Sequence, residues 1–162
     1  MKMNRRRVLK IAGATIVVAG SALAWRAFDQ GVFSAWSGAA YEPWKNWQAD
    51  DSLRPLRLVR AAILASNPHN SQPWRFRVTD DAIDVYADTG RNIGAIDPFL
   101  REMTMGIGCA LENLLIAAAN EGYAAEISML PESGNPAHAA HIALAAGTKI
   151  ASPLYDAIAL RH

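Results

Sequence analysis

The sequence has very little cysteine: Cys109 is the only one among 162 residues. A single thiol excludes an internal disulfide, and with four scattered histidines it excludes a structural zinc site built from several cysteines. Internal repeats and low-complexity tracts are also absent, as are a catalytic triad motif and a pair of candidate catalytic carboxylates. The fold must therefore rely on an apolar core, without a covalent cross-link.

Basic residues are scarce once the first ten residues are set aside. The whole chain has 16 Lys and Arg against 15 Asp and Glu, and five of the basic residues lie within residues 1–10. Removing these five leaves 11 basic residues against 15 acidic ones, a net charge of −4. Nucleic-acid binding needs a basic surface, so we expect no nucleic-acid partner. The 138 residues after position 24 suffice for one domain.

Residues 1–24 have the features of an export leader. The segment Asn4-Arg5-Arg6-Arg7-Val8-Leu9-Lys10 resembles a twin-arginine signal, in which the export machinery would read Arg5 and Arg6. An apolar run over residues 11–24 follows and ends in small residues, as a signal peptidase site requires. Fourteen residues are short for a membrane span, which needs about 20. An ordinary secretory signal is the alternative. Either leader predicts export to the periplasm or cell surface, with membrane contact or anchoring if the leader is retained.

Residues 25–50 contain four of the five tryptophans. One interpretation is a linker whose aromatic side chains pack onto the domain that follows, and we favour it. The other is a segment at the membrane–water boundary, where Trp and Tyr are enriched. These aromatic residues are Trp25, Phe28, Phe33, Trp36, Tyr41, Trp44 and Trp47.

Residues 51–162 form the predicted domain, of α+β class. Apolar residues at helical spacing predict a helix from a cap at Ser52 to about Ser66, where Pro68 disfavours its continuation. Alternating segments at 74–78 and 83–87 predict a β-hairpin. Residues 124–130 and 139–146 predict two further strands, and Ser152-Pro153 opens a last helix. We therefore expect a small antiparallel or mixed sheet with helices.

A long helix over residues 98–121, closed by Gly122, is predicted to lie at the centre of the domain. It is apolar almost all round from Met103 to Ala119, which is typical of an enclosed helix. Cys109 is accordingly expected to be a buried small residue and not a nucleophile. A stripe of small residues should allow another element to approach closely: Gly106, Ala110, Asn113 and Ala117.

The segment most informative about chemistry is residues 65–74, Ala-Ser-Asn-Pro-His-Asn-Ser-Gln-Pro-Trp. It joins a helix end to a strand start, where side chains can face a ligand. The carboxamides of Asn70 and Gln72 each offer a donor and an acceptor, which suits the alternating carbonyl and N–H groups of a flavin ring. Trp74 could add an apolar wall. The alternative is a turn that only stops a helix, which leaves the Gln-Pro-Trp sequence unexplained.

This segment resembles the motif Ala-Pro-Ser-x-x-Asn-x-Gln-Pro-Trp of nitroreductase-like flavoenzymes. Residues 106–123 resemble the long central helix of that family, and residues 97–102 resemble an exported branch with two fused lobes. Together the similar segments cover roughly residues 55–130. The resemblance implies a nitroreductase-like lobe, a bound FMN, and electron transfer from a reduced nicotinamide or another donor to a nitro, quinone or similar acceptor.

The resemblance also implies the cofactor-binding residues. Asn70 and Gln72 match the family positions that contact the polar side of the flavin ring. Asn67, His69 and Trp74 lie in the same motif, although Ser66-Asn67 replaces the usual Pro-Ser. The final Leu160-Arg161-His162 resembles the start of the segment Arg-His-Thr-Asn-Arg, so Arg161 is expected to serve the flavin phosphate. The chain is thus expected to be incomplete and to lack a second lobe that would form a pseudo-dimer.

The sequence also allows a second function for the chain and other roles for three of its residues. The chain could be a non-catalytic exported domain that holds flavin or binds a partner, or an inert fragment. His138 and His141 are spaced as metal ligands on a helix would be, but a loop entering a strand is predicted there, which favours histidines with ordinary structural roles. Arg91 is either a phosphate contact or a solvated loop charge, and we favour the latter.

Overall fold

The computed structural model describes residues 4–33, 38–48 and 55–161. The chain divides into two compact units, Met1–Lys45 and Asn46–His162. The first unit contains α1 (Arg5–Asp29), whose N-cap Asn4 accepts a hydrogen bond from the Arg6 N–H. A short helix, α2 (Glu42–Asn46), lies at the junction of the two. Trp36 and Ser52, for which a packing and a capping role were predicted, lie outside the described residues.

The second unit is α+β, consistent with a nitroreductase-like fold. Its helices are α3 (Leu56–Ala62), α4 (Arg101–Glu121) and α5 (Pro153–Ala157). Its strands are β1 (Trp74–Val78), β2 (Ala82–Ala87), β3 (Tyr123–Met129) and β4 (His138–Ala146). The sheet order is β1-β2-β4-β3, and every neighbouring pair is antiparallel. The predicted hairpin and the two later strands are confirmed.

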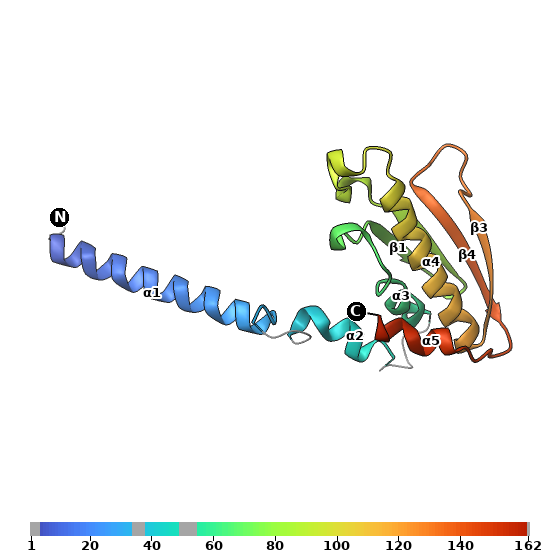
Figure 1. The fold of residues 1–162 in the computed structure, drawn as a ribbon, viewed down its shortest axis with the longest axis horizontal. Helices are drawn as coiled ribbons and strands as arrows, with labels where there is room; N and C mark the ends of the chain where they lie inside the picture. The colour runs from blue at the N-terminus through green and yellow to red at the C-terminus, as the bar shows by residue number, and fades with distance from the viewer. Residues whose placement is uncertain (1–3, 34–37, 49–54, 162) are drawn as a thin grey trace. The chain divides into compact units, whose positions relative to one another are not determined.

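One face of the sheet packs against α4, as Figure 1 shows for the long gold helix. Ile83 pairs with Ile142 and Val85 with Ala140, and all four side chains are fully buried. Leu58 of α3 and Leu114 of α4 are fully buried as well. The core thus lies between the sheet and the helices.

The helix α3 is shorter than predicted. It ends at Ala62, and the chain continues in a tight turn in which the N–H groups of Leu64 and Ala65 bond the carbonyls three residues earlier. Such bonds tighten the last turn and end the helix before the constraint from Pro68 applies.

The helix α4 is only half enclosed, which corrects the prediction of a helix buried all round. Its buried residues recur at helical spacing, from Met103 through Ala110 to Ala118. Between them runs an exposed stripe, and Cys109 lies on it. An apolar composition therefore did not imply enclosure. The exposed positions on this stripe are Met105, Gly108, Cys109 and Glu112.

A buried polar contact joins α3, α4 and α5. Arg57 of α3 lies 3.0 Å from Glu121 of α4, and the Tyr155 hydroxyl of α5 donates to the same carboxylate oxygen at 2.7 Å. Burial, together with this carboxylate, raises the pKa of Tyr155 to about 12. Trp47 packs on the Tyr155 ring at 4.8 Å and is only 5% exposed, so one of the predicted linker aromatics does pack onto the domain.

Candidate functional site

The loop between α3 and β1 has an unusual backbone. His69, Asn70 and Gln72 all have positive φ, at 47°, 54° and 48°. Left-handed backbone is uncommon for residues other than glycine and costs on the order of 1–3 kcal/mol for each when strained. Such residues cluster at ligand-binding sites. The sequence places a histidine and a glutamine here where glycine would be easiest, which suggests that their side chains are required.

Several hydrogen bonds hold the loop in this conformation. Asn67 accepts from the Gln72 N–H at 2.8 Å and donates to the Ala65 carbonyl at 3.2 Å. The Gln72 carbonyl in turn accepts from the Trp74 N–H and from the Arg91 guanidinium, at 2.9 and 3.3 Å. Asn67 therefore braces the loop, and Arg91 reaches it from the turn after β2.

The loop presents three polar side chains to solvent: His69, Asn70 and Gln72 are all exposed. Gln72 Nε2 donates to Asn70 Oδ1 at 3.4 Å, so the two carboxamides lie side by side. Asn70 Nδ2 and Gln72 Oε1 make no hydrogen bond with any described residue. One donor and one acceptor thus remain available to a ligand.

Trp74 does not form the predicted apolar wall of a ligand site, because its side chain is buried. It begins β1 and is 6% exposed, and the adjacent Pro73 is fully buried. Both side chains belong to the core beneath the loop and fix where the strand starts. Of the residues predicted for cofactor binding, Asn67, His69, Asn70 and Gln72 lie together, whereas Trp74 supports them from inside.

A close contact joins this loop to α4. A Cβ on Gly106 would lie 3.2 Å from Pro68 Cδ and 3.3 Å from Asn67 Cβ. Farther along the helix, Asn113 Nδ2 donates to the Ala61 carbonyl at 3.1 Å. The predicted stripe of small residues therefore faces α3 and the loop. Glycine at 106 lets the loop lie directly on the helix.

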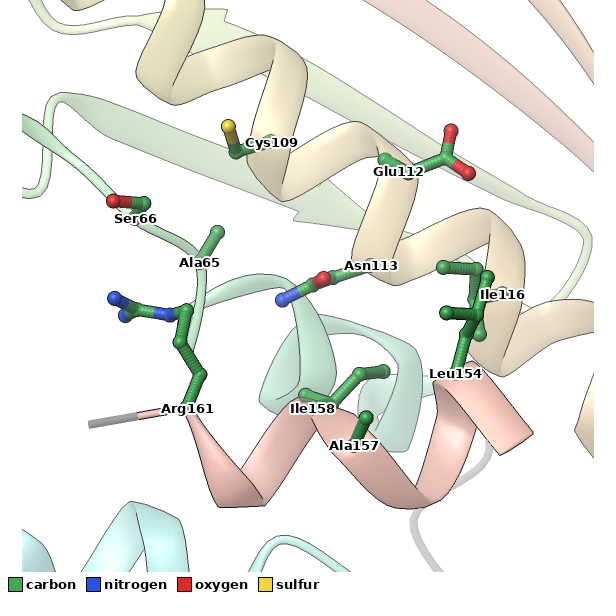
Figure 2. A pocket seen from close by; sticks show the side chains of 10 residues that line it. All are labelled: Ala65, Ser66, Cys109, Glu112, Asn113, Ile116, Leu154, Ala157, Ile158 and Arg161. Carbon is green, nitrogen blue, oxygen red and sulfur yellow. The ribbon is translucent and has the colours of Figure 1, made fainter. Parts of the chain in front are cut away.

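Two adjoining hollows follow the exposed stripe of α4. One of about 350 Å³ lies beside Asn67 and Pro68, and one of about 300 Å³ lies between α4 and α5; Ser66 and Cys109 line both. Figure 2 shows the second, with Arg161 extending toward Ala65 and Ser66. Arg161 Nη2 donates to the Leu64 carbonyl at 2.8 Å. The guanidinium group of Arg161 therefore lies at one end of this second hollow, a mainly apolar groove between α4 and α5.

The start of α4 is fixed by Asp97. Its carboxylate accepts from the N–H groups of Arg101 and Met103 at 2.8 and 3.0 Å. Burial alone would raise the pKa of Asp97, but backbone donors, Met103 first, outweigh burial and lower it. The helix begins at Arg101, three residues later than the sequence predicted, with Leu100 at the N-cap position. Sequence reasoning missed the carboxylate of Asp97, which accepts hydrogen bonds from the first turn.

Sequence reasoning also missed Ser71 and the contact between Arg91 and the loop. The Ser71 hydroxyl is buried and has no partner among the described residues, a cost of about 1–3 kcal/mol. The Arg91 contact with the loop joins residues 19 apart, which no local pattern reveals. Arg91 also lies 3.5 Å from Asp88, so it is a bridging residue of the site and not only a solvated charge.

The two histidines considered as metal ligands lie on the sheet. His138 Nε2 and His141 Nδ1 are 3.0 and 2.7 Å from the same oxygen of Asp84, whose other oxygen bonds Arg77. His138 Nδ1 is 3.1 Å from Glu132 but outside hydrogen-bond geometry. His138 lies within β4, contrary to the predicted loop, and a bulge in the β2–β4 pairing puts it against Tyr86. These contacts fit structural roles for both histidines.

Comparison with known proteins adds a family relation. No family model matches the chain. A Mycobacterium tuberculosis protein named "Putative NAD(P)H nitroreductase Rv3131" is 30% identical over 97 residues, 60% of this chain and 28% of that protein. Another, "Putative NAD(P)H nitroreductase acg", is 34% identical over 84 residues, 52% of this chain and 25% of that one. These relatives support a nitroreductase-like, oxidoreductase character. The chain matches only about a quarter of their length.

Proposed function

We propose that the second unit is a flavin-binding lobe of an FMN-dependent oxidoreductase that passes electrons from a reduced nicotinamide or another donor to a nitro, quinone or similar acceptor. The observation that carries the proposal is the loop held by Asn67 and Arg91. Three of its residues other than glycine have left-handed backbone, and two of these, Asn70 and Gln72, present adjacent carboxamides. The names of the relatives, NAD(P)H nitroreductases, support the same reaction class.

The exposed groups of the loop fit the polar edge of a flavin. Asn70 Nδ2 can donate to a ring carbonyl, and Gln72 Oε1 can accept from a ring N–H. The loop is already held by Asn67 and Arg91, so little side-chain or backbone freedom is lost when a ligand binds. Arg161, beside the apolar groove, offers a cation for a phosphate.

When bound, FMN supplies the redox chemistry, and the protein supplies binding and orientation. Asn70 and Gln72 would orient the ring, while Asn67 positions Gln72 through its backbone. The exposed stripe of α4 would offer apolar contact. This division of labour agrees with a sequence that has no catalytic triad or carboxylate pair.

The proposal is tested by titrating FMN fluorescence with purified wild-type protein, Asn70→Ala and Gln72→Ala. Each lost hydrogen bond of about 0.5–1.5 kcal/mol should weaken binding by about 2- to 13-fold. Asn135→Ala is the matched control, because this carboxamide bonds Glu132 in the β3–β4 turn. It should bind FMN as the wild type does.

Each outcome separates the proposal from its alternative. Binding by the wild type that weakens in both loop variants supports a flavin site. Binding without reduction of a nitroaromatic or quinone, either by NAD(P)H or by another electron donor, would favour a flavin-holding domain over an enzyme. Wild-type protein that leaves FMN fluorescence unchanged would refute the flavin assignment.

We further propose that the first unit directs export by the twin-arginine route. The support is the order of residues 4–10, with a guanidinium pair at Arg5 and Arg6 followed by an apolar pair and Lys10. A route that carries folded proteins suits a domain that must acquire its cofactor before export. Reduced nicotinamide is scarce outside the cytoplasm, which is why the electron donor in this proposal is left general.

A further inference from the structure

The helix α1 is longer than the apolar run from which a cleavable leader was predicted. That run ends at Ala24, but α1 continues for five more residues to Asp29 without a break. Its segment Leu9–Asp29 has 21 residues, is long and apolar enough to cross a membrane, and none of its apolar stretch is buried. At 1.5 Å per residue the segment is about 30 Å long, the thickness of a bilayer's hydrocarbon core.

The polar side chains inside this segment are satisfied by the helix itself. The Thr15 hydroxyl donates to the Ile11 carbonyl at 2.9 Å, and the Ser21 hydroxyl donates to the Val17 carbonyl at 2.8 Å. A hydroxyl without a partner is costly in hydrocarbon, and bonds to the carbonyl four residues earlier remove that cost. The helix can therefore face lipid along its middle.

The two ends of the helix differ in chemistry. Arg5, Arg6 and Lys10 give the first end a positive charge, which matches the anionic lipids of a cytoplasmic leaflet. Trp25, Phe28 and Phe33 lie at the other end, each at least 67% exposed. Of these three, tryptophan is the residue type that is enriched at the membrane–water boundary. Lys10 and Arg26 lie about 24 Å apart along the axis, and their long stems can carry both charges to the headgroups.

We propose that α1 is kept as an uncleaved membrane anchor whose partner is the lipid bilayer, with the arginine end on the cytoplasmic side. A peptidase binds its cleavage segment in extended form. Here Ala22 and Ala24 lie inside the helix, which contains no proline and ends only at Asp29. Cleavage after Ala24 therefore requires unwinding of a helix that the bilayer itself stabilises. This inference does not depend on the flavin assignment.

The test expresses the full chain in a bacterium, floats the membranes on a sucrose gradient to remove aggregates, and washes them at alkaline pH. Intact mass then reports the N-terminus. The proposal expects the protein in the washed membranes, with residues 1–24 still attached. A chain that begins at Trp25, or one that leaves the membranes in the wash, would overturn it.

A pair of variants at one position tests the role of the continuous helix. Ser21→Pro breaks α1 just before Ala22, whereas Ser21→Ala keeps the helix and removes only the hydroxyl. Ser21→Pro should yield chains that begin at Trp25, whereas Ser21→Ala, like the wild type, should keep residues 1–24. Equal fractions of chains that begin at Trp25 in the two variants would show that the continuous helix does not protect the leader.

Discussion

Asn67 Oδ1 accepts a 2.8 Å hydrogen bond from the backbone N–H of Gln72, five residues later. The amide nitrogen of the same side chain donates to the Ala65 carbonyl at 3.2 Å. Both ends of this carboxamide are thus used inside the loop. Asn67 was predicted as a flavin contact, but its geometry favours a positioning role, in which it holds Gln72 where a ligand would meet it.

The first prediction follows from this bond. Asn67→Ala should lower stability by about 0.5–1.5 kcal/mol and weaken FMN binding, because Gln72 loses the partner that fixes its backbone. Asn67→Asp keeps an acceptor oxygen for the same N–H and should bind FMN more tightly than the alanine variant. Urea unfolding and FMN titration measure the two effects. Wild-type behaviour of the alanine variant in both assays would contradict the bracing role.

The second prediction compares two glycines of α4. An alanine at Gly108 would meet nothing within 4 Å, so Gly108→Ala should stabilise the protein by about 0.5–1 kcal/mol through helix propensity. An alanine at Gly106 would press on Pro68 and Asn67, so Gly106→Ala should forfeit this gain and disturb the loop.

The pair is measured by urea unfolding together with FMN titration. Gly108→Ala is the control for helix propensity, since both changes add the same methyl group to the same helix. Only Gly106→Ala should weaken FMN binding. Equal stabilisation by both variants, with unchanged FMN binding, would show that the loop at Asn67 and Pro68 can shift to accommodate the added methyl group without cost.

Much of the fold followed from local patterns. The hairpin was predicted because residues 74–78 and 83–87 alternate between apolar and polar types, and the C-cap at Gly122 followed from its position after an apolar helix. Gly122 does adopt the left-handed conformation, with φ of 84°. These features depend on residues that are near neighbours in the sequence.

The predictions that failed depended on contacts between residues far apart in the sequence. The openness of α4 at Cys109 could not be predicted, because composition does not say how many elements surround a helix. In the candidate site, the carboxamides of Asn70 and Gln72 were predicted from their motif. The contributions of Arg91 and Asp97 were not, since each depends on a loop geometry that forms only when the domain folds.

The third prediction concerns export. Arg5→Lys combined with Arg6→Lys keeps the charge but removes the guanidinium pair, which a twin-arginine receptor distinguishes from lysine. The double variant should accumulate in the cytoplasm, as measured by cell fractionation. Lys10→Arg is the control, because it changes a basic residue outside the pair. Export of the double lysine variant at the wild-type level would indicate the ordinary secretory route.

The last prediction concerns acid stability and rests on Asp84. Burial alone would raise the pKa of this carboxyl, but hydrogen bonds from His141, Arg77 and His138 outweigh burial and hold the pKa below the ordinary value of 3.8. A carboxyl whose pKa is lower in the folded state stabilises the fold above its unfolded pKa. That contribution is lost as the pH falls through the folded pKa.

Asp84→Asn removes the charge and leaves the shape, so it should be less stable than the wild type at pH 7. The difference should shrink as the pH falls below about 3.8, where the carboxyl of the unfolded wild-type chain begins to take up a proton, and it should be lost as the pH falls through the lower pKa of the folded state. Urea unfolding of both proteins between pH 7 and pH 3 gives the two free energies. Asp80→Asn, in the exposed hairpin turn, serves as the control and should show no such convergence. A gap between Asp84→Asn and the wild type that stays constant with pH would mean that the carboxylate charge does not stabilise this cluster.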